Sequence, residues 1–82
     1  MDCKDCDLVK ANLSGANLFM ANLTRTDLRR ADLTGAYLTE ADLSDANLTG
    51  ANLTGADLSS DILDDVIGAD FTGAVNVPPK YR

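Results

Sequence analysis

Aromatic residues, histidine and long apolar runs are scarce or missing in this chain of 82 residues. Aromatic residues make up 5% of it, and it has no Trp and no His, so small aliphatic side chains must build any core. With two Cys and no His, the chain lacks the four ligands of a structural zinc site. No apolar run is long enough to cross a bilayer and no signal peptide is visible, so no membrane partner is expected.

Basic residues are also in deficit. Seven Lys and Arg against thirteen Asp and Glu give a formal net charge of −6. Phosphate binding requires a basic surface, so the charge argues against direct binding to nucleic acid.

The dominant feature of the chain is a repeat of five residues. Leu occupies every fifth position from Leu8 to Leu63, twelve times. Ala stands two residues before nearly every Leu, and Asp or Asn stands between them, with Tyr37 as an exception. Such a period forms no stripe on a helix and alternates faces on a flat strand. Short extended stretches joined by corners every five residues can point every Leu and Ala inward and every Asp or Asn outward.

The corners have a matching composition. Pairs such as Ser14-Gly15 and Thr34-Gly35 follow the Leu residues. If Leu opens a four-residue turn, Gly takes the third place, where a type II turn needs φ > 0.

Tandem copies such as Ala41-Asp42-Leu43-Ser44-Asp45 resemble the pentapeptide-repeat family, whose pattern is A(D/N)LXX, over residues 6–60 and again at 69–71. The chain is similar to short cyanobacterial members. The resemblance implies an all-β fold, a right-handed quadrilateral β-helix with twenty residues per coil and the Leu and Ala side chains inside. Residues 1–60 would then form about three coils, in a monomer or an end-to-end dimer.

Two segments lie outside the regular repeat. Asp61 falls on an inward Ala position, where a charge would be buried. The stretch 60–68 reads instead as a short helix, with a Ser cap, acidic residues in its first turn, and Gly68 at its end. The single domain, residues 1–82, is thus expected to contain repeats at 6–60, a helical insertion or cap at 60–68, and a final repeat and tail at 69–82.

The N-terminal Cys3-Lys4-Asp5-Cys6 has the CxxC spacing. Cys3 falls on the Leu position and Cys6 on the next Ala position, so both point inward across one turn, within disulfide reach. A structural bridge or buried thiols are the favoured interpretation, with a redox pair or a shared metal as alternatives. A bridge would be compatible with an oxidising compartment such as the periplasm or thylakoid lumen.

The surface offers two departures from the repeat. Phe19 and Met20 occupy outward corner positions, and Tyr37 replaces an outward Asp or Asn, which together suggest an apolar partner patch. Basic residues cluster at Arg25, Arg29 and Arg30, either as an exposed salt-bridge ladder or as a small docking patch.

No catalytic constellation or cofactor site emerges, because the carboxylates lie on regular outer columns and the interior holds no pocket. A non-catalytic structural or protein-interaction module, with an unknown protein partner, is therefore expected. The alternatives are an acidic DNA mimic, as in gyrase-binding members of the resembled family, and a redox-responsive protein acting through the CxxC pair.

Overall fold

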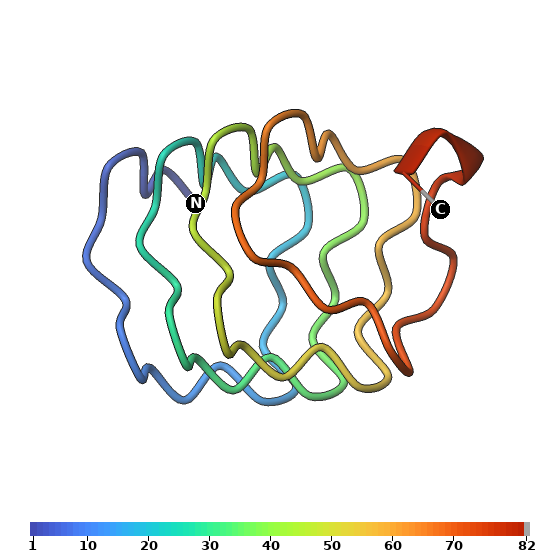
Figure 1. Ribbon diagram of the computed structural model, residues 1–82, viewed down its shortest axis with the longest axis horizontal. Helices are drawn as coiled ribbons and strands as arrows, with labels where there is room; N and C mark the ends of the chain where they lie inside the picture. Colours follow the sequence, from blue (N-terminus) through green and yellow to red (C-terminus); the bar gives the residue numbers. More distant parts are fainter. Residues whose placement is uncertain (82) are drawn as a thin grey trace.

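The fold is a coil of short extended segments, shown by a computed structural model that describes residues 1–81 (Figure 1). Isolated parallel bridges join residues twenty positions apart, from Asp2–Asn22 to Asn47–Ile67. Each bridge is held by two backbone hydrogen bonds. In the Asp27–Asn47 bridge, Leu28 N–H donates to the Asn47 carbonyl at 2.8 Å, and Asn47 N–H donates to the Thr26 carbonyl at 3.0 Å. The five-residue repeat therefore forms a β-helix.

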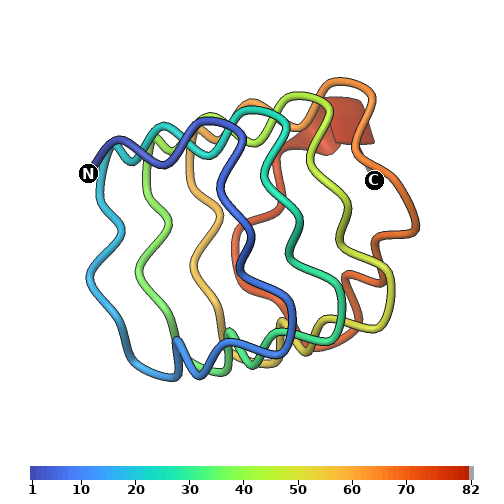
Figure 2. The same cartoon turned by 90° about the vertical axis from the view of Figure 1, so that its left-hand side faces the viewer.

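Four extended segments and four corners make up each twenty-residue coil, which gives the stack four faces (Figure 2). We number the faces by the outward residues that pair along them. Face 1 carries Asp2, Asn22, Asp42 and Ile62; face 2 carries Asp7, Asp27, Asn47 and Ile67; face 3 carries Asn12, Asp32 and Asn52; face 4 carries Asn17, Tyr37, Asp57 and Val75. Because the faces follow one another around the coil, face 4 lies opposite face 2.

The corners are the four-residue turns that the sequence predicts. Ala16 N–H donates to the Leu13 carbonyl at 3.0 Å, and the third residue, Gly15, has φ 68°. Ten residues other than Gly hold a positive φ, and most of them stand at this same corner position, among them Met20 and Arg30. The left-handed conformation costs an L-residue roughly 1–2 kcal/mol. The repeat sustains that cost because each turn is fixed by pairing to the neighbouring coils.

The core is the stack of inward Leu and Ala. Leu23, Leu28, Leu33 and Leu38 are each 0% exposed. In the first coil, by contrast, Leu8 is only half-buried, since no described coil covers it from the other side. The one polar interruption in the middle of the stack, Thr26, is also buried, and its hydroxyl donates to the carbonyl of Cys3 at 2.7 Å. Burial of stacked aliphatic side chains is what stabilises the coil.

The predicted helix at 60–68 is wrong. The coil continues through this segment, with Ile62 paired to Asp42, Ile67 paired to Asn47, and Leu63 buried in the stack. Pairing with the coil beneath supplies backbone partners and a buried Leu, which outweigh the weak local preference for a helical cap. Among residues 1–81 the sole helical element is a short 3₁₀ helix, η1 (Pro79–Tyr81).

Three coils are therefore followed by most of a fourth, and this last coil is shorter by two residues. Val75 pairs with Asp57 at a spacing of eighteen, and Leu58 N–H donates to the Val75 carbonyl at 2.9 Å. The shortening falls at the corner after Ile67, where Gly68, with φ 66°, turns the chain directly into Ala69. The expected repeat at 69–73 follows, as shown by the turn bond from Ala74 N–H to the Phe71 carbonyl. Arg82, at the end of the predicted tail, lies outside the described residues.

Candidate functional site

The outward Asp and Asn side chains have a structural task. Each turns back on its own corner and accepts a hydrogen bond from the backbone N–H two residues later, as Asn12 does from Ser14 at 3.2 Å. Where Thr or Ser stands at that second position, its hydroxyl often donates to the same oxygen, as Thr34 does to Asp32 at 2.6 Å. These bonds to Thr34 hold the pKa of the Asp32 carboxyl below its usual value. The acidic columns are therefore largely built into the corners, as Asx-type turns.

Tyr37 departs from this pattern and leaves its corner without the side-chain acceptor. It stands between Asn17 and Asp57 on face 4, and its side chain is 59% exposed. A phenol placed there does not provide the acceptor that Asn or Asp gives to the corner N–H, which here belongs to Thr39. An exposed aromatic ring that replaces a useful local hydrogen bond has no structural explanation in the repeat.

Phe19 and Met20 form the corner between faces 4 and 1 in the first coil. They are 52% and 62% exposed, and Met20 also holds the strained φ of 58°. Phe19 N–H still donates the ordinary bond to Asn17 Oδ1 at 3.2 Å. Because Asn17 pairs with Tyr37 and Met20 N–H donates to the Thr39 carbonyl at 3.0 Å, this corner stacks against the corner that follows Tyr37 in the next coil. We call Phe19, Met20 and Tyr37 the apolar patch.

The predicted basic cluster lies elsewhere. Arg25 occupies the corner between faces 1 and 2, and Arg29 and Arg30 occupy the next corner, so the three flank face 2. Arg25 Nε pairs with Asp5 Oδ1 of the coil below at 2.8 Å, and Arg29 Nη2 pairs with Asp27 Oδ2 at 2.7 Å. Bonds from Arg25 and Arg29 lower the pKa of their partner carboxyls. All four side chains are substantially exposed, so these pairs contribute little stability.

The six surface residues that the sequence predicts thus divide into two groups on opposite faces. The apolar patch lies on face 4 and its corner, whereas the basic residues flank face 2. No single flat partner can contact both. The twenty-residue coil accounts for this separation, because Phe19 and Arg29 stand ten residues, or half a coil, apart.

Cys3 and Cys6 form a disulfide across the first turn, with their Cα atoms 5.1 Å apart. Cys6 N–H donates to the Cys3 carbonyl at 2.9 Å, so the bridge reinforces an ordinary corner. The pair spans the corner between faces 1 and 2, whereas Tyr37 of the apolar patch lies on face 4. Among the described residues, no group of three or more potential ligands could hold a metal ion.

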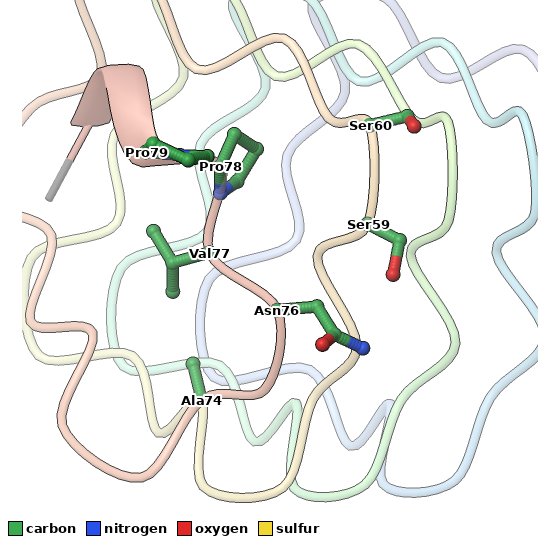
Figure 3. Close-up of a pocket in the computed structure, with 7 residues that line it drawn as sticks. All are labelled: Ser59, Ser60, Ala74, Asn76, Val77, Pro78 and Pro79. Atoms are coloured by element: carbon green, nitrogen blue, oxygen red, sulfur yellow. The ribbon is translucent and has the colours of Figure 1, made fainter.

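A groove of about 660 Å³ opens at the other end, between face 4 and the tail (Figure 3). Ser59 and Ser60 line one side, and the tail segment from Asn76 to Pro79 lines the other. Asn76 Nδ2 donates to Asp57 Oδ1 at 3.3 Å, which ties the tail to the coil. The sequence carries no signal for this groove, because it is formed by a tail that has no repeat.

Asp61, next to the groove, lies in the coil and not in the predicted helix. It does occupy the inward Ala position, and it is 5% exposed. Its Oδ1 accepts the N–H of Ala41 at 3.0 Å, while its Oδ2 is buried without a partner. Burial raises the pKa of this carboxyl to about 7, and the bond from Ala41 offsets only part of that effect. The Asp61 carboxyl is therefore buried in the coil, whereas the predicted helix would have exposed it.

No helix among residues 1–81 has the length and apolar character needed to cross a membrane. The Pentapeptide repeats family model matches the chain in eight copies, over residues 2–35 and 21–59. No curated protein sequence matches it.

Two solved structures from cyanobacteria are similar. HetL from Nostoc sp. strain PCC 7120, a protein involved in the regulation of heterocyst differentiation, has 43% sequence identity and a TM-score of 0.79 over 80% of this chain. Rfr23 from Cyanothece 51142 has 37% identity and a TM-score of 0.60 over 90% of it. The aligned region spans 31% of HetL and 56% of Rfr23.

Proposed function

The chain belongs to the pentapeptide-repeat family, and from that premise we propose that it is a non-catalytic protein-interaction module that docks through the apolar patch. Members of the family are generally repeat proteins without enzymatic activity. The solved neighbours imply the right-handed hand of the β-helix. A regulatory role of the kind named for HetL would suit a module that acts by binding.

Tyr37 is the observation that carries the proposal. From Asp2 to Asp57, Tyr37 is the one outward residue of the four faces that replaces the acceptor, and it does so with an exposed ring; beyond Asp57 the outward Ile62, Ile67 and Val75 also lack an acceptor. Phe19 and Met20 extend the apolar surface to the adjacent corner. Aromatic and Met side chains are enriched at protein interfaces, because they bury large apolar areas when a partner covers them.

The acidic columns are less suited to the alternative of DNA mimicry. Many of their carboxylates accept hydrogen bonds from corner N–H groups, as Asp32 does. Arg25 and Arg29 also form ion pairs with Asp5 and Asp27, two carboxylates that such a mimic would need to present. Duplex DNA carries one charge per ~1.7 Å. A short stack with principal extents of 27 × 22 × 20 Å, interrupted by basic side chains, reproduces that array poorly.

The test is a double change, Phe19→Ser with Tyr37→Asn, which restores the repeat's own chemistry at both positions. We expect the variant to fold and to lose any partner that the wild-type chain recovers in a pull-down. The matched control is Val9→Ser with Asn12→Asp, which alters the corresponding corner and outward positions elsewhere in the first coil and should keep the partner. Recovery unaffected by the double change would refute the docking surface. Inhibition of gyrase supercoiling by wild type and double variant alike would favour the DNA mimic instead.

A further inference from the structure

The C-terminal tail binds the start of the shortened last coil. Tyr81 Oη donates to Asp64 Oδ1 at 2.8 Å, and Lys80 Nζ pairs with the same oxygen at 3.2 Å. The tail reaches this point after passing Ser59 and Ser60 along the groove (Figure 3). Val77 and Tyr81 pack against the core. The tail thus spans the segment 60–64, with Asp61 in the middle of it. We call residues 77–81 the cap.

The burial of Asp61 depends on the cap. In the first coil, which no described segment covers, the inward residues Cys6, Ala11 and Ala16 are only half-buried. Asp61 stands near the other end of the stack, yet it is 5% exposed. The cap lies next to this part of the coil, because Tyr81 and Lys80 bind Asp64, three residues after Asp61, and Tyr81 packs against the core. Lifting the cap would therefore return the Asp61 carboxyl to water.

A carboxyl in this position favours the closed cap only when it is neutral. Its Oδ1 has one donor, Ala41 N–H, and its Oδ2 has none. The charged groups nearest to it offer no compensation. Asp57, beside it in the same coil, disfavours its ionisation, Glu40 and Asp42 flank Ala41 in the coil beneath, and Lys80 of the cap is paired with Asp64. An unpaired charge in such a site is strongly unfavourable.

We propose that Asp61 makes the cap a pH-sensitive latch: the neutral carboxyl lets residues 77–81 close on the last coil, and the ionised carboxylate drives them open. Opening would uncover the groove and the inner side chains at this end of the stack, next to face 4. The inference is independent of the proposed partner surface.

The direction and size of the response follow from linkage. With the cap closed, the pKa of Asp61 is raised to about 7; with the cap open, it returns towards 3.8. Across that interval, each pH unit multiplies the open-to-closed ratio by about ten, for a total on the order of 10³, and the ratio levels off above the closed-state pKa. The chain has no His, and Asp57 and Asp64 have lowered pKa values. Asp61 is thus the side chain positioned to respond between pH 5 and 7.

Tyr81 can report on the latch directly, because the chain has two Tyr and no Trp. In a Tyr37→Phe background, Tyr81 is the one fluorophore of its kind, and a neutral quencher such as acrylamide measures its accessibility. We expect quenching to rise between pH 5 and 7 and then to level off. The isosteric Asp61→Asn and the repeat-like Asp61→Ala should abolish that rise, and Asp61→Ala retains the fold because Ala occupies this column in the coils beneath.

A second control separates the titration of Asp61 from the bonds that hold the cap to Asp64. Asp64→Asn removes the partner charge of Lys80 and weakens the bond to Tyr81, so it should raise quenching at every pH while leaving the pH-dependent rise in place. Quenching of wild-type Tyr81 that stays flat from pH 5 to 8 would overturn the proposal. An unchanged rise in Asp61→Asn would overturn it equally, because another group would then be responsible.

Discussion

Gly68 is the position where one added methyl group tests the shortened last coil. Its backbone has φ 66°, and an ideal Cβ built on it would overlap Thr49 Oγ1 and lie 3.1 Å from Thr49 Cα. Thr49 cannot easily move away, because its hydroxyl donates to Asn47 Oδ1 at 2.7 Å and holds the corner of the coil beneath. Gly68→Ala must therefore displace backbone or break that bond.

Gly15 supplies the matched control. It has nearly the same backbone, φ 68°, but an added Cβ would meet nothing within 4 Å. Both substitutions carry the left-handed strain of roughly 1–2 kcal/mol, partly offset by about 0.4–1 kcal/mol from the stiffer unfolded chain. Only Gly68→Ala adds the overpacking cost of about 1–3 kcal/mol. We expect the free energy of unfolding to fall by about 2 kcal/mol more for Gly68→Ala than for Gly15→Ala.

Urea and thermal unfolding followed by circular dichroism measure this difference. For a domain of this size, 1 kcal/mol corresponds to about 4–8 °C in Tm. Adding Thr49→Ala to Gly68→Ala should recover part of the loss, since it removes the overlapping hydroxyl. Equal destabilisation at Gly15 and Gly68 would refute the shortened corner at Gly68, and with it the pairing of Asp57 with Val75.

Further predictions concern the core, corners and ends. Leu38→Arg places a charge among stacked Leu and should prevent folding, whereas Thr39→Ala should change stability by less than ~0.5 kcal/mol, as thermal melts would show. Tyr37→Asn restores a corner acceptor and should stabilise the chain by about 0.5–1 kcal/mol in urea titrations. Reducing Cys3–Cys6 should cost at most roughly 2 kcal/mol and raise hydrogen exchange in the first coil alone. Asp61→Ala should stabilise the chain by roughly 2–4 kcal/mol at pH 7 and by progressively less as pH falls towards 3.8, because the wild type loses stability as pH rises through that interval.

The inward and outward positions of the repeat could be predicted because they follow from one period. Leu and Ala at fixed phase must point inward if any five-residue coil forms, and the corner after Leu13 has the predicted turn. The role of Asn12 and its equivalents was only half predicted. Their outward direction follows from alternation, but their bond to the corner N–H depends on a backbone geometry that the period alone does not supply.

The C-terminal region could not be predicted in the same way. Ser60, the acidic residues and Gly68 are local signals for a helix, yet each has another use in the coil: Ser60 and Asp65 stand at positive-φ corners, and Gly68 makes a shortened one. Asp61 stands at an inward position, and an acidic residue there disfavours the repeat when only the local sequence is considered. The coil accommodates it because the tail covers it. Contacts between segments about twenty residues apart decided these positions, and they have no signature within a short window of sequence.

Site-specific photo-crosslinking tests the central claim, that face 4 is the docking surface, most directly. A photoreactive residue is placed at Tyr37 on face 4 and, in a separate variant, at Asn52 on face 3. Both residues are outward and exposed, and both stand at the same position within their pentapeptides. The interaction-module account predicts a discrete crosslinked protein from position 37 in source cells, absent from position 52 and lost when Phe19→Ser is added. Equal crosslinking at both positions, or a specific product from position 52 alone, would contradict it.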